Sequence, residues 1–116
     1  MAQRGYPKGA RLRRRSEFLS LQREGRRRHT DHLVVIKRPA LGPAARLGVT
    51  ASSRVGNAVV RNRIKRIVRE VFRHYRADLV PPQDLVVIAK PGADNLTYAQ
   101  AAIEFARALE LKPYSR

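Results

Sequence analysis

The sequence contains no cysteine, no tryptophan and few acidic residues. The absence of cysteine excludes disulfides, thiolate metal ligands and cysteine nucleophiles. No apolar run approaches the roughly 20 residues that cross a bilayer, and no apolar segment follows the basic stretch MAQRGYPKGARLRRR as it would in a secretory signal. We therefore expect a cytoplasmic protein with no membrane partner.

The length of 116 residues suits one domain with its own core. The hydrophobic fraction of 43% is ordinary for a folded chain and gives no sign of disorder. We predict a single domain over residues 1–116, in which residues 1–14 form a basic, flexible arm.

Positive charge dominates the chain and is unevenly distributed. The 25 Lys and Arg residues exceed the 9 Asp and Glu residues by 16. Residues 1–76 hold 21 basic and 4 acidic residues, a net charge of +17, whereas residues 77–116 hold 4 and 5, a net charge of −1. Such a field attracts polyanions, and nucleic acid fits best because its dense phosphates release counterions on binding. A coding bias toward Arg would explain the preference for Arg over Lys, but not this placement.

Turn residues and apolar patterns predict the element order α, β, β, α, β, α. Ser16 is the predicted N-cap of a short helix, SEFLSLQRE, which Gly25 ends. The segments HLVVIKR and RLGVTASS read as strands, and the short loop between them favours an antiparallel pair.

The second half of the chain predicts a helix, a strand and a last helix. Asn57 is the predicted N-cap of a long helix that ends near Arg76, and Thr97 that of the last helix, YAQAAIEFARALELK. The continuous apolar run of DLVVIAK is typical of a strand covered on both faces. This strand and RLGVTASS flank the long helix, so they should be parallel if they share a sheet.

The long helix is apolar on one side and basic on the other. At about 100° per residue, one arc holds Val60, Ile64, Ile67, Val68, Val71, Phe72 and Tyr75. The opposite arc holds Asn62, Lys65, Arg66, Arg69, Arg73 and Arg76. Neighbouring like charges on this arc repel each other, so a helix that tolerates them suggests an anionic partner. Arg61 and Arg63 lie about 200° apart at the helix start, where free backbone N–H groups also favour phosphate.

Two other interpretations of the basic arc are a solvated surface and a membrane-surface helix. The net charge of the whole chain disfavours the first. The flanking strands disfavour the second, because they need the apolar arc for a core.

No catalytic or metal-binding constellation is apparent. The nine carboxylates are scattered and form no paired motif, which argues against an autonomous two-metal nuclease. In the segment HTDH, strand alternation would place His29 and Asp31 on one face and His32 on the other, so they should not converge. The phosphate-binding pattern GxxxxGK[ST] does not occur.

The segment RLGVTASSRVGNAVVRNRIKRIVREVFR resembles the protein subunit of bacterial ribonuclease P, whose family signature contains RNR. RLRRRSEFLSLQREG before it and LVVIAKPGADNLTY after it also match, so the resemblance covers nearly the whole chain. It implies a two-layer α+β sandwich of the ribosomal protein S5 domain 2-like type. The basic helix would then make a left-handed βαβ crossover, opposite to the usual hand.

The resemblance also implies the binding partners and the separate roles of the protein and the RNA subunit. The partners would be the catalytic RNA of ribonuclease P and precursor tRNA, with no obligate protein partner. The RNA subunit would catalyse removal of the 5′ leader, using Mg²⁺ held mainly by the RNA subunit and the substrate. No residue of this chain would be catalytic or hold a metal tightly.

Two sets of binding residues follow from the resemblance. The set expected to contact the catalytic RNA comprises Arg54, Asn57, Arg61, Asn62, Arg63, Lys65, Arg66, Arg69 and Arg73. The set expected in a cleft between the first helix and the sheet, which would take the single-stranded leader, comprises Phe18, Val34, Ile36, Thr50 and Lys90. Phe18 would either stack on a base or pack in the core. Gln22 and Ile36 stand where family members often carry further aromatic residues, which predicts weaker stacking.

Two alternative functions stay open from the sequence. One is an RNA- or DNA-binding module of another ribonucleoprotein, similar to a ribosomal protein and using the same helix. The other is a stand-alone ribonuclease.

Overall fold

The computed structural model describes residues 10–12 and 14–112. The elements are α1 (Arg15–Glu24), β1 (Arg26–His29), β2 (Leu33–Pro39), β3 (Arg46–Thr50), α2 (Ala58–Tyr75), η2 (Arg76–Asp78), β4 (Gln83–Ala89), η3 (Ala93–Asn95) and α3 (Tyr98–Leu109). The predicted α+β class is confirmed.

The four strands form one sheet in the order β1-β2-β4-β3. β4 pairs in antiparallel fashion with β2 and in parallel with β3, so the predicted parallel pair around the long helix is confirmed. The predicted antiparallel pair of β2 with β3 is wrong, because β4 lies between them. The physical reason lies in β4 itself: Leu85, Val86 and Val87 are completely buried, and such a strand gains most from a central position.

Strand β1 was not predicted from the sequence. Its residues, RRRH, are all exposed, and they pair in antiparallel fashion with β2 through a turn in which the Thr30 N–H donates to the Leu33 carbonyl at 2.8 Å. An edge strand needs a partner on one side only, and charged residues protect its open side from further pairing. Hydrophobic alternation therefore could not have revealed it.

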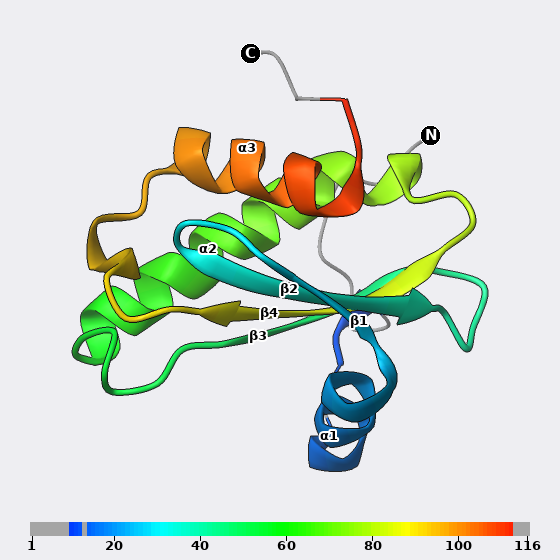
Figure 1. Ribbon diagram of the computed structural model, residues 1–116, viewed down its shortest axis with the longest axis horizontal. Helices are drawn as coiled ribbons and strands as arrows, with labels where there is room; N and C mark the ends of the chain where they lie inside the picture. The colour runs from blue at the N-terminus through cyan, green and yellow to red at the C-terminus, as the bar shows by residue number, and fades with distance from the viewer. Residues whose placement is uncertain (1–9, 13, 113–116) are drawn as a thin grey trace.

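Helices cover both faces of the sheet (Figure 1). α2 and α3 lie on one face, where Ile64, Val68, Val71, Phe72 and Tyr75 of α2 are buried in the larger apolar cluster. This confirms the apolar arc predicted for the long helix. α1 lies on the other face over a smaller cluster of Leu12, Leu21, Val34, Ile36 and Val86. Among the described residues, no helix is both long and apolar enough to cross a membrane.

Two of the three predicted N-caps are confirmed. Asn57 accepts a hydrogen bond from the Val60 N–H at 3.0 Å, and Thr97 forms a capping box with Gln100. The predicted cap at Ser16 is wrong, since α1 begins at Arg15 and its N-cap residue, Arg14, makes no side-chain cap bond.

The end of the predicted N-terminal arm is packed against the sheet. Ala10 is completely buried, Leu12 is 5% exposed, and the Leu12 N–H donates to the Leu47 carbonyl at 3.0 Å. The prediction of a flexible arm is therefore corrected for residues 10–12, because these apolar side chains gain by extending the core beside β3. Residues 1–9 and 13 of that arm lie outside the described residues.

Candidate nucleic-acid interface

A stripe of basic residues runs along the side of α2 that faces away from the core. This basic stripe consists of Lys65, Arg66, Arg69 and Arg73 of α2 together with Arg76, the first residue of η2. Its ends are eleven positions apart, which corresponds to a rise of about 16 Å along the helix. Arg66 is exposed and the other four are half-buried. The Arg73 guanidinium pairs with the Glu70 carboxylate at 2.9 Å, which offsets one of the five charges.

The start of α2 adds the positive end of a helix to this charge. No acidic residue occupies the first turn, so the partial positive charge of the N-terminal N–H groups is not neutralised there. Arg54, Asn57 and Asn62 are exposed around this end, and Arg61 is half-buried. A helix N-terminus surrounded by cationic and amide side chains suits a phosphate group.

Arg63 points away from the stripe. Its Nη1 donates to the Leu96 carbonyl at 2.8 Å, and its Nη2 donates to the Asp94 carbonyl. These contacts tie the start of α2 to the η3 segment. They agree with the expected divergence of Arg61 and Arg63, and they commit two of the five guanidinium N–H donors to the protein itself.

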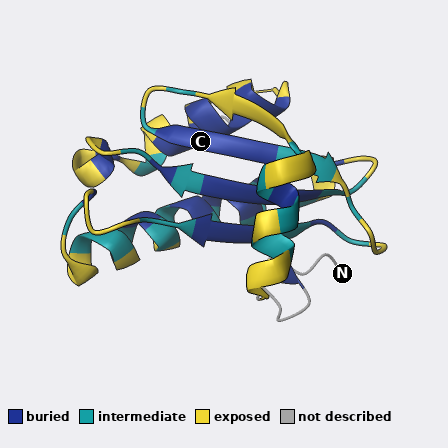
Figure 2. Ribbon diagram, turned by 60° about the horizontal axis from the view of Figure 1, so that its bottom comes forward, coloured by how far each residue is buried: buried dark blue, intermediate teal, exposed yellow. Residues whose placement is uncertain are grey.

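The face of the sheet on the α1 side is ordered in rows that the strand register defines. The row farthest from α1 runs across all four strands through His29, Val34, Ile88 and Thr50. The next row contains Arg27, Ile36, Val86 and Gly48, and the last contains Arg38, Asp84 and Arg46. α1 lies across one end of this face and leaves the other end bare of helix (Figure 2).

Phe18 of α1 packs directly on the backbone of β3. A Cβ at Gly48 would overlap the Phe18 ring, so only glycine allows this close approach. Phe18 as a residue is half-buried and packs against the smaller cluster. Phe18 therefore packs on the core, which is one of the two roles expected for it, and base stacking stays a prediction.

The other residues expected to bind the leader differ in their access to solvent. Val34 is 7% exposed, Thr50 is half-buried and Lys90 is half-buried. Ile36 is completely buried under α1, so it supports the face by packing and has no surface for direct contact.

A buried ion-pair network holds α1 on the sheet. Asp84 is completely buried and accepts two hydrogen bonds from Arg46, at 3.2 Å from Nε and 3.0 Å from Nη2. Arg46 also donates to Glu17 of α1 at 2.7 Å, and Arg38 donates to Ser20 at 2.8 Å. The hydrogen bonds to Asp84 raise the pKa of Arg46 despite its partial burial, which keeps the guanidinium charged.

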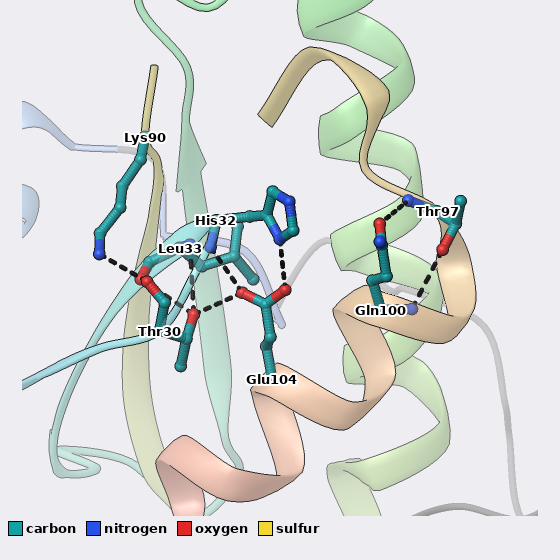
Figure 3. Close-up of polar contacts among 7 residues, drawn as sticks. All are labelled: Thr30, His32, Leu33, Lys90, Thr97, Gln100 and Glu104. Atoms are coloured by element: carbon teal, nitrogen blue, oxygen red, sulfur yellow. Dashed lines mark hydrogen bonds and ion pairs between the residues drawn. The ribbon is translucent and has the colours of Figure 1, made fainter. Parts of the chain in front are cut away.

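A second buried carboxylate, Glu104 of α3, fixes the β1–β2 turn (Figure 3). Its oxygens accept hydrogen bonds from the Thr30 hydroxyl at 2.6 Å and the His32 N–H at 2.8 Å, and contact His32 Nδ1 at 2.6 Å. Burial opposes the charge, but the hydrogen bonds from Thr30 and His32 outweigh it, so the pKa of Glu104 lies below its usual value. The Lys90 ammonium donates to the Thr30 carbonyl, which places this predicted leader residue beside the same turn.

The described residues do not offer a site for a divalent metal. Within residues 10–12 and 14–112, no group of three or more His, Cys, Asp or Glu side chains could hold an ion. In the HTDH segment, His32 turns to Glu104, while His29 and Asp31 are exposed at the edge of the sheet.

A small α+β protein with a four-stranded sheet and one basic helical surface is the class that this geometry defines. The family model for Ribonuclease P matches residues 6–111. The chain therefore belongs to the ribonuclease P protein family, as its sequence predicted. Members are subunits of an endoribonuclease of tRNA processing, and membership implies association with the RNase P RNA.

Individual relatives support the same assignment. The chain is 43% identical to the ribonuclease P protein component of Desulfovibrio desulfuricans, over 95% of this chain and 83% of the relative. It is 42% identical to that of Citrifermentans bemidjiense, over 93% and 92%. Among solved structures, the RNase P protein of Staphylococcus aureus matches with a TM-score of 0.80 and 29% identity, over 89% of this chain and 94% of the other. The RNase P protein of Thermotoga maritima, in complex with 1-(4-fluorophenyl)-2-thiourea, matches with a TM-score of 0.76 and 29% identity, over 85% and 96%.

Proposed function

We propose that this chain binds the catalytic RNA of ribonuclease P and the 5′ leader of precursor tRNA, and so promotes Mg²⁺-dependent removal of the leader. The observation that carries the proposal is the two-sided helix α2. Its apolar side is buried in the core, whereas its basic stripe and its N-terminal end face outward together. A charged surface held this rigidly suits a structured phosphate backbone.

We assign the RNA subunit to the stripe and to the start of α2. The contact set is the one expected from the sequence: Arg54, Asn57, Arg61, Asn62, Arg63, Lys65, Arg66, Arg69 and Arg73. Within this set Arg54, Asn62 and Arg66 are the best candidates for direct phosphate contact, because they are exposed and, unlike Asn57, do not cap the helix. Arg63 acts chiefly by fixing the helix start, because it already donates to two backbone carbonyls.

We assign the leader to the α1 face of the sheet. Phe18 offers an aromatic surface there, and base stacking on such a surface tolerates any sequence. Val34 and Thr50 belong to the row farthest from α1, in which Thr50 is half-buried and Val34 packs in the smaller cluster, and Lys90 adds a charge at the end of this row. The α1 face thus combines the apolar and cationic groups that a single strand requires.

The chemistry belongs to the RNA subunit in this proposal. Mg²⁺ would be held mainly by that RNA and by the substrate, where it supplies an activated water for phosphodiester hydrolysis. The protein's cations would screen phosphate repulsion between the two RNAs, and so lower the Mg²⁺ concentration that assembly requires. No obligate protein partner is needed for these roles.

The finer description of the fold belongs to the same proposal. We infer the ribosomal protein S5 domain 2-like type and a left-handed β3–α2–β4 connection. The parallel, adjacent strands β3 and β4, which α2 connects in sequence, support the βαβ unit, and its left hand rests on the family resemblance.

Reconstitution tests this function directly. Purified protein and a bacterial RNase P RNA are assayed separately and together on precursor tRNA at low Mg²⁺, scoring the correct mature 5′ end. We expect cleavage only when both are present. Cleavage by the protein alone would instead establish a stand-alone ribonuclease, a possibility raised by the S. aureus relative, for which a mutant with defective mRNA degradation activity is known.

A second assay separates the proposal from a general nucleic-acid-binding module. The RNase P RNA and duplex DNA of equal length compete for the protein at matched salt. We expect the protein to bind the RNase P RNA with clearly higher affinity than the duplex DNA. Equal affinities would favour the general nucleic-acid-binding module.

A further inference from the structure

The edge strand β1 carries basic charge at the edge of the sheet opposite β3, the strand that leads into α2. Its three arginines, Arg26, Arg27 and Arg28, are all exposed. The order β1-β2-β4-β3 places this edge three strand spacings, about 14 Å, from β3. β3 leads into the loop before α2, so the two basic surfaces stand at opposite edges of one sheet.

Alternation divides the arginines of β1 between the two faces of the sheet. Arg28 pairs across the strands with Val35, and its guanidinium reaches Glu110 after α3 at 2.8 Å. Arg27 pairs with Ile36, which lies under α1, and its Nη2 donates to the carbonyl of Gln22 in α1 at 3.1 Å. Arg27 therefore belongs to the α1 face, whereas Arg26 and Arg28 belong to the α3 face.

The position of β1 is fixed by the core. The turn that joins β1 to β2 is held by Glu104, which is 7% exposed and accepts hydrogen bonds from Thr30 and His32. An arginine on a fixed strand loses less entropy on binding a ligand than one on a mobile loop. The hydrogen bond to the Gln22 carbonyl further restricts the Arg27 guanidinium at the end of the α1 face.

We propose that Arg27, with His29 beside it, is an additional phosphate-binding site for the single-stranded leader at the β1 edge of the α1 face. The inference rests on the proposed function, which places the leader on this face and the RNA subunit at the start of α2. A strand that begins near Thr50 and follows the row Thr50, Ile88, Val34, His29 reaches Arg27 after crossing four strands. At about 3.4 Å per stacked nucleotide, the 14 Å crossing takes about four nucleotides.

Charge complementarity selects the occupant of this edge. Three arginines on four consecutive residues present cations to both sides of an exposed strand, and guanidinium groups match the geometry of phosphate oxygens. On the α1 face the neighbours of Arg27 are the apolar Ile36 and the α1 backbone, and within the part of the chain that the structure describes its guanidinium contacts no carboxylate. A single-stranded polyanion is therefore the ligand that this end of the face fits.

The proposal predicts an effect that depends on leader length. The complex of the protein with RNase P RNA is titrated with precursor tRNAs whose leaders have about two or about ten nucleotides, a span chosen from the site sizes of single-strand-binding surfaces. One phosphate contact contributes a salt slope of about 0.7, which corresponds to about fivefold in affinity at 0.1 M salt. We expect Arg27→Ala to weaken binding of the long-leader substrate about fivefold and to leave the short-leader substrate nearly unchanged.

Matched variants keep this result interpretable. Arg26→Ala removes the same charge from the same strand but on the opposite face, so it should have little effect with either substrate. Arg27→Lys should restore part of the affinity, because it keeps the charge without the guanidinium fork. The thermal midpoint of each variant reports whether the lost hydrogen bond to Gln22 alters folding.

The outcomes distinguish this inference from the proposed function. An equal loss for both leader lengths, or an equal loss in Arg27→Ala and Arg26→Ala, would overturn the β1 site. Arg27 would then act only through the overall charge of the protein or through its hydrogen bond to α1. If Phe18→Leu weakens long-leader binding while Arg27→Ala does not, the leader lies on the α1 face but leaves it before β1. If the affinity for precursor tRNA does not depend on leader length in the wild type or in any variant, the assignment of the leader to this face fails as a whole.

Discussion

The double variant Arg66→Ala plus Arg69→Ala tests whether the basic stripe contacts RNA phosphates. Each contact contributes about 0.7 to 0.9 to the slope of log K against log salt, so the loss of two lowers the slope by about 1.4 to 1.8. At 0.1 M salt this corresponds to a loss of about 25-fold to 60-fold in affinity. Alanine has a helix propensity at least as high as that of arginine, so α2 itself should persist.

The assay is the affinity for RNase P RNA over a series of salt concentrations. The matched control is Arg26→Ala plus Arg107→Ala, which removes the same two charges from exposed positions on β1 and α3. Both variants lower the long-range attraction equally, so the difference between them reports local contact. An unchanged slope in the stripe variant, or equal slopes in the two variants, would show that the stripe is only solvated surface.

The remaining predictions concern the α1 face and the two buried carboxylates. Phe18→Leu keeps apolar bulk over Gly48 but removes the ring, so it should weaken binding of precursor tRNA by about 1 kcal/mol or more and leave mature tRNA unaffected. Asp84→Asn leaves Arg46 without its carboxylate partner and should lower the free energy of unfolding by about 3 kcal/mol, measured by denaturant titration. Glu104→Gln should lower the thermal midpoint at pH 7, and the difference from the wild type should shrink as the pH falls.

The pH dependence of the last variant follows from the sign of the shift. The pKa of Glu104 is lowered in the folded protein from an ordinary value of 4.5, so its stabilising contribution is fully present above that value. The contribution is lost as the pH falls through the folded pKa, when the carboxylate becomes protonated. A difference in thermal midpoint that stays constant from pH 7 to about pH 3 would contradict this role. Likewise, equal losses for precursor and mature tRNA in Phe18→Leu, or an unaltered unfolding free energy in Asp84→Asn, would refute those two predictions.

Periodicity predicted the helix that forms the main candidate surface. The arc from Val60 to Tyr75 is the buried side of α2, and Asn57 is its N-cap. Both predictions are confirmed, because each depends only on residues within this one helix. The apolar run DLVVIAK likewise predicted a strand covered on both faces, and β4 is that strand.

Features that depend on distant contacts were not predictable from local patterns. β1 consists of RRRH and gains its strand conformation only from pairing with β2. The order of β2, β4 and β3 depends on which strand gains most from the central position, and no local sequence pattern indicates that order. Glu104 meets His32 across 72 positions of sequence, and its only local signal was an acidic residue inside the apolar pattern AIEFA. Local patterns therefore did not indicate the turn that Glu104 holds, nor Arg27, the residue proposed to bind the leader on the adjoining strand.

The Mg²⁺ dependence of leader removal tests the central claim most directly, namely that the charge on α2 serves a catalytic RNA. The rate of correct 5′ processing by RNase P RNA is measured against Mg²⁺ concentration without protein, with the wild type and with Arg66→Ala plus Arg69→Ala. We expect the wild type to shift the requirement to markedly lower Mg²⁺ and the variant to lose much of that shift. Three coincident curves would contradict the claim.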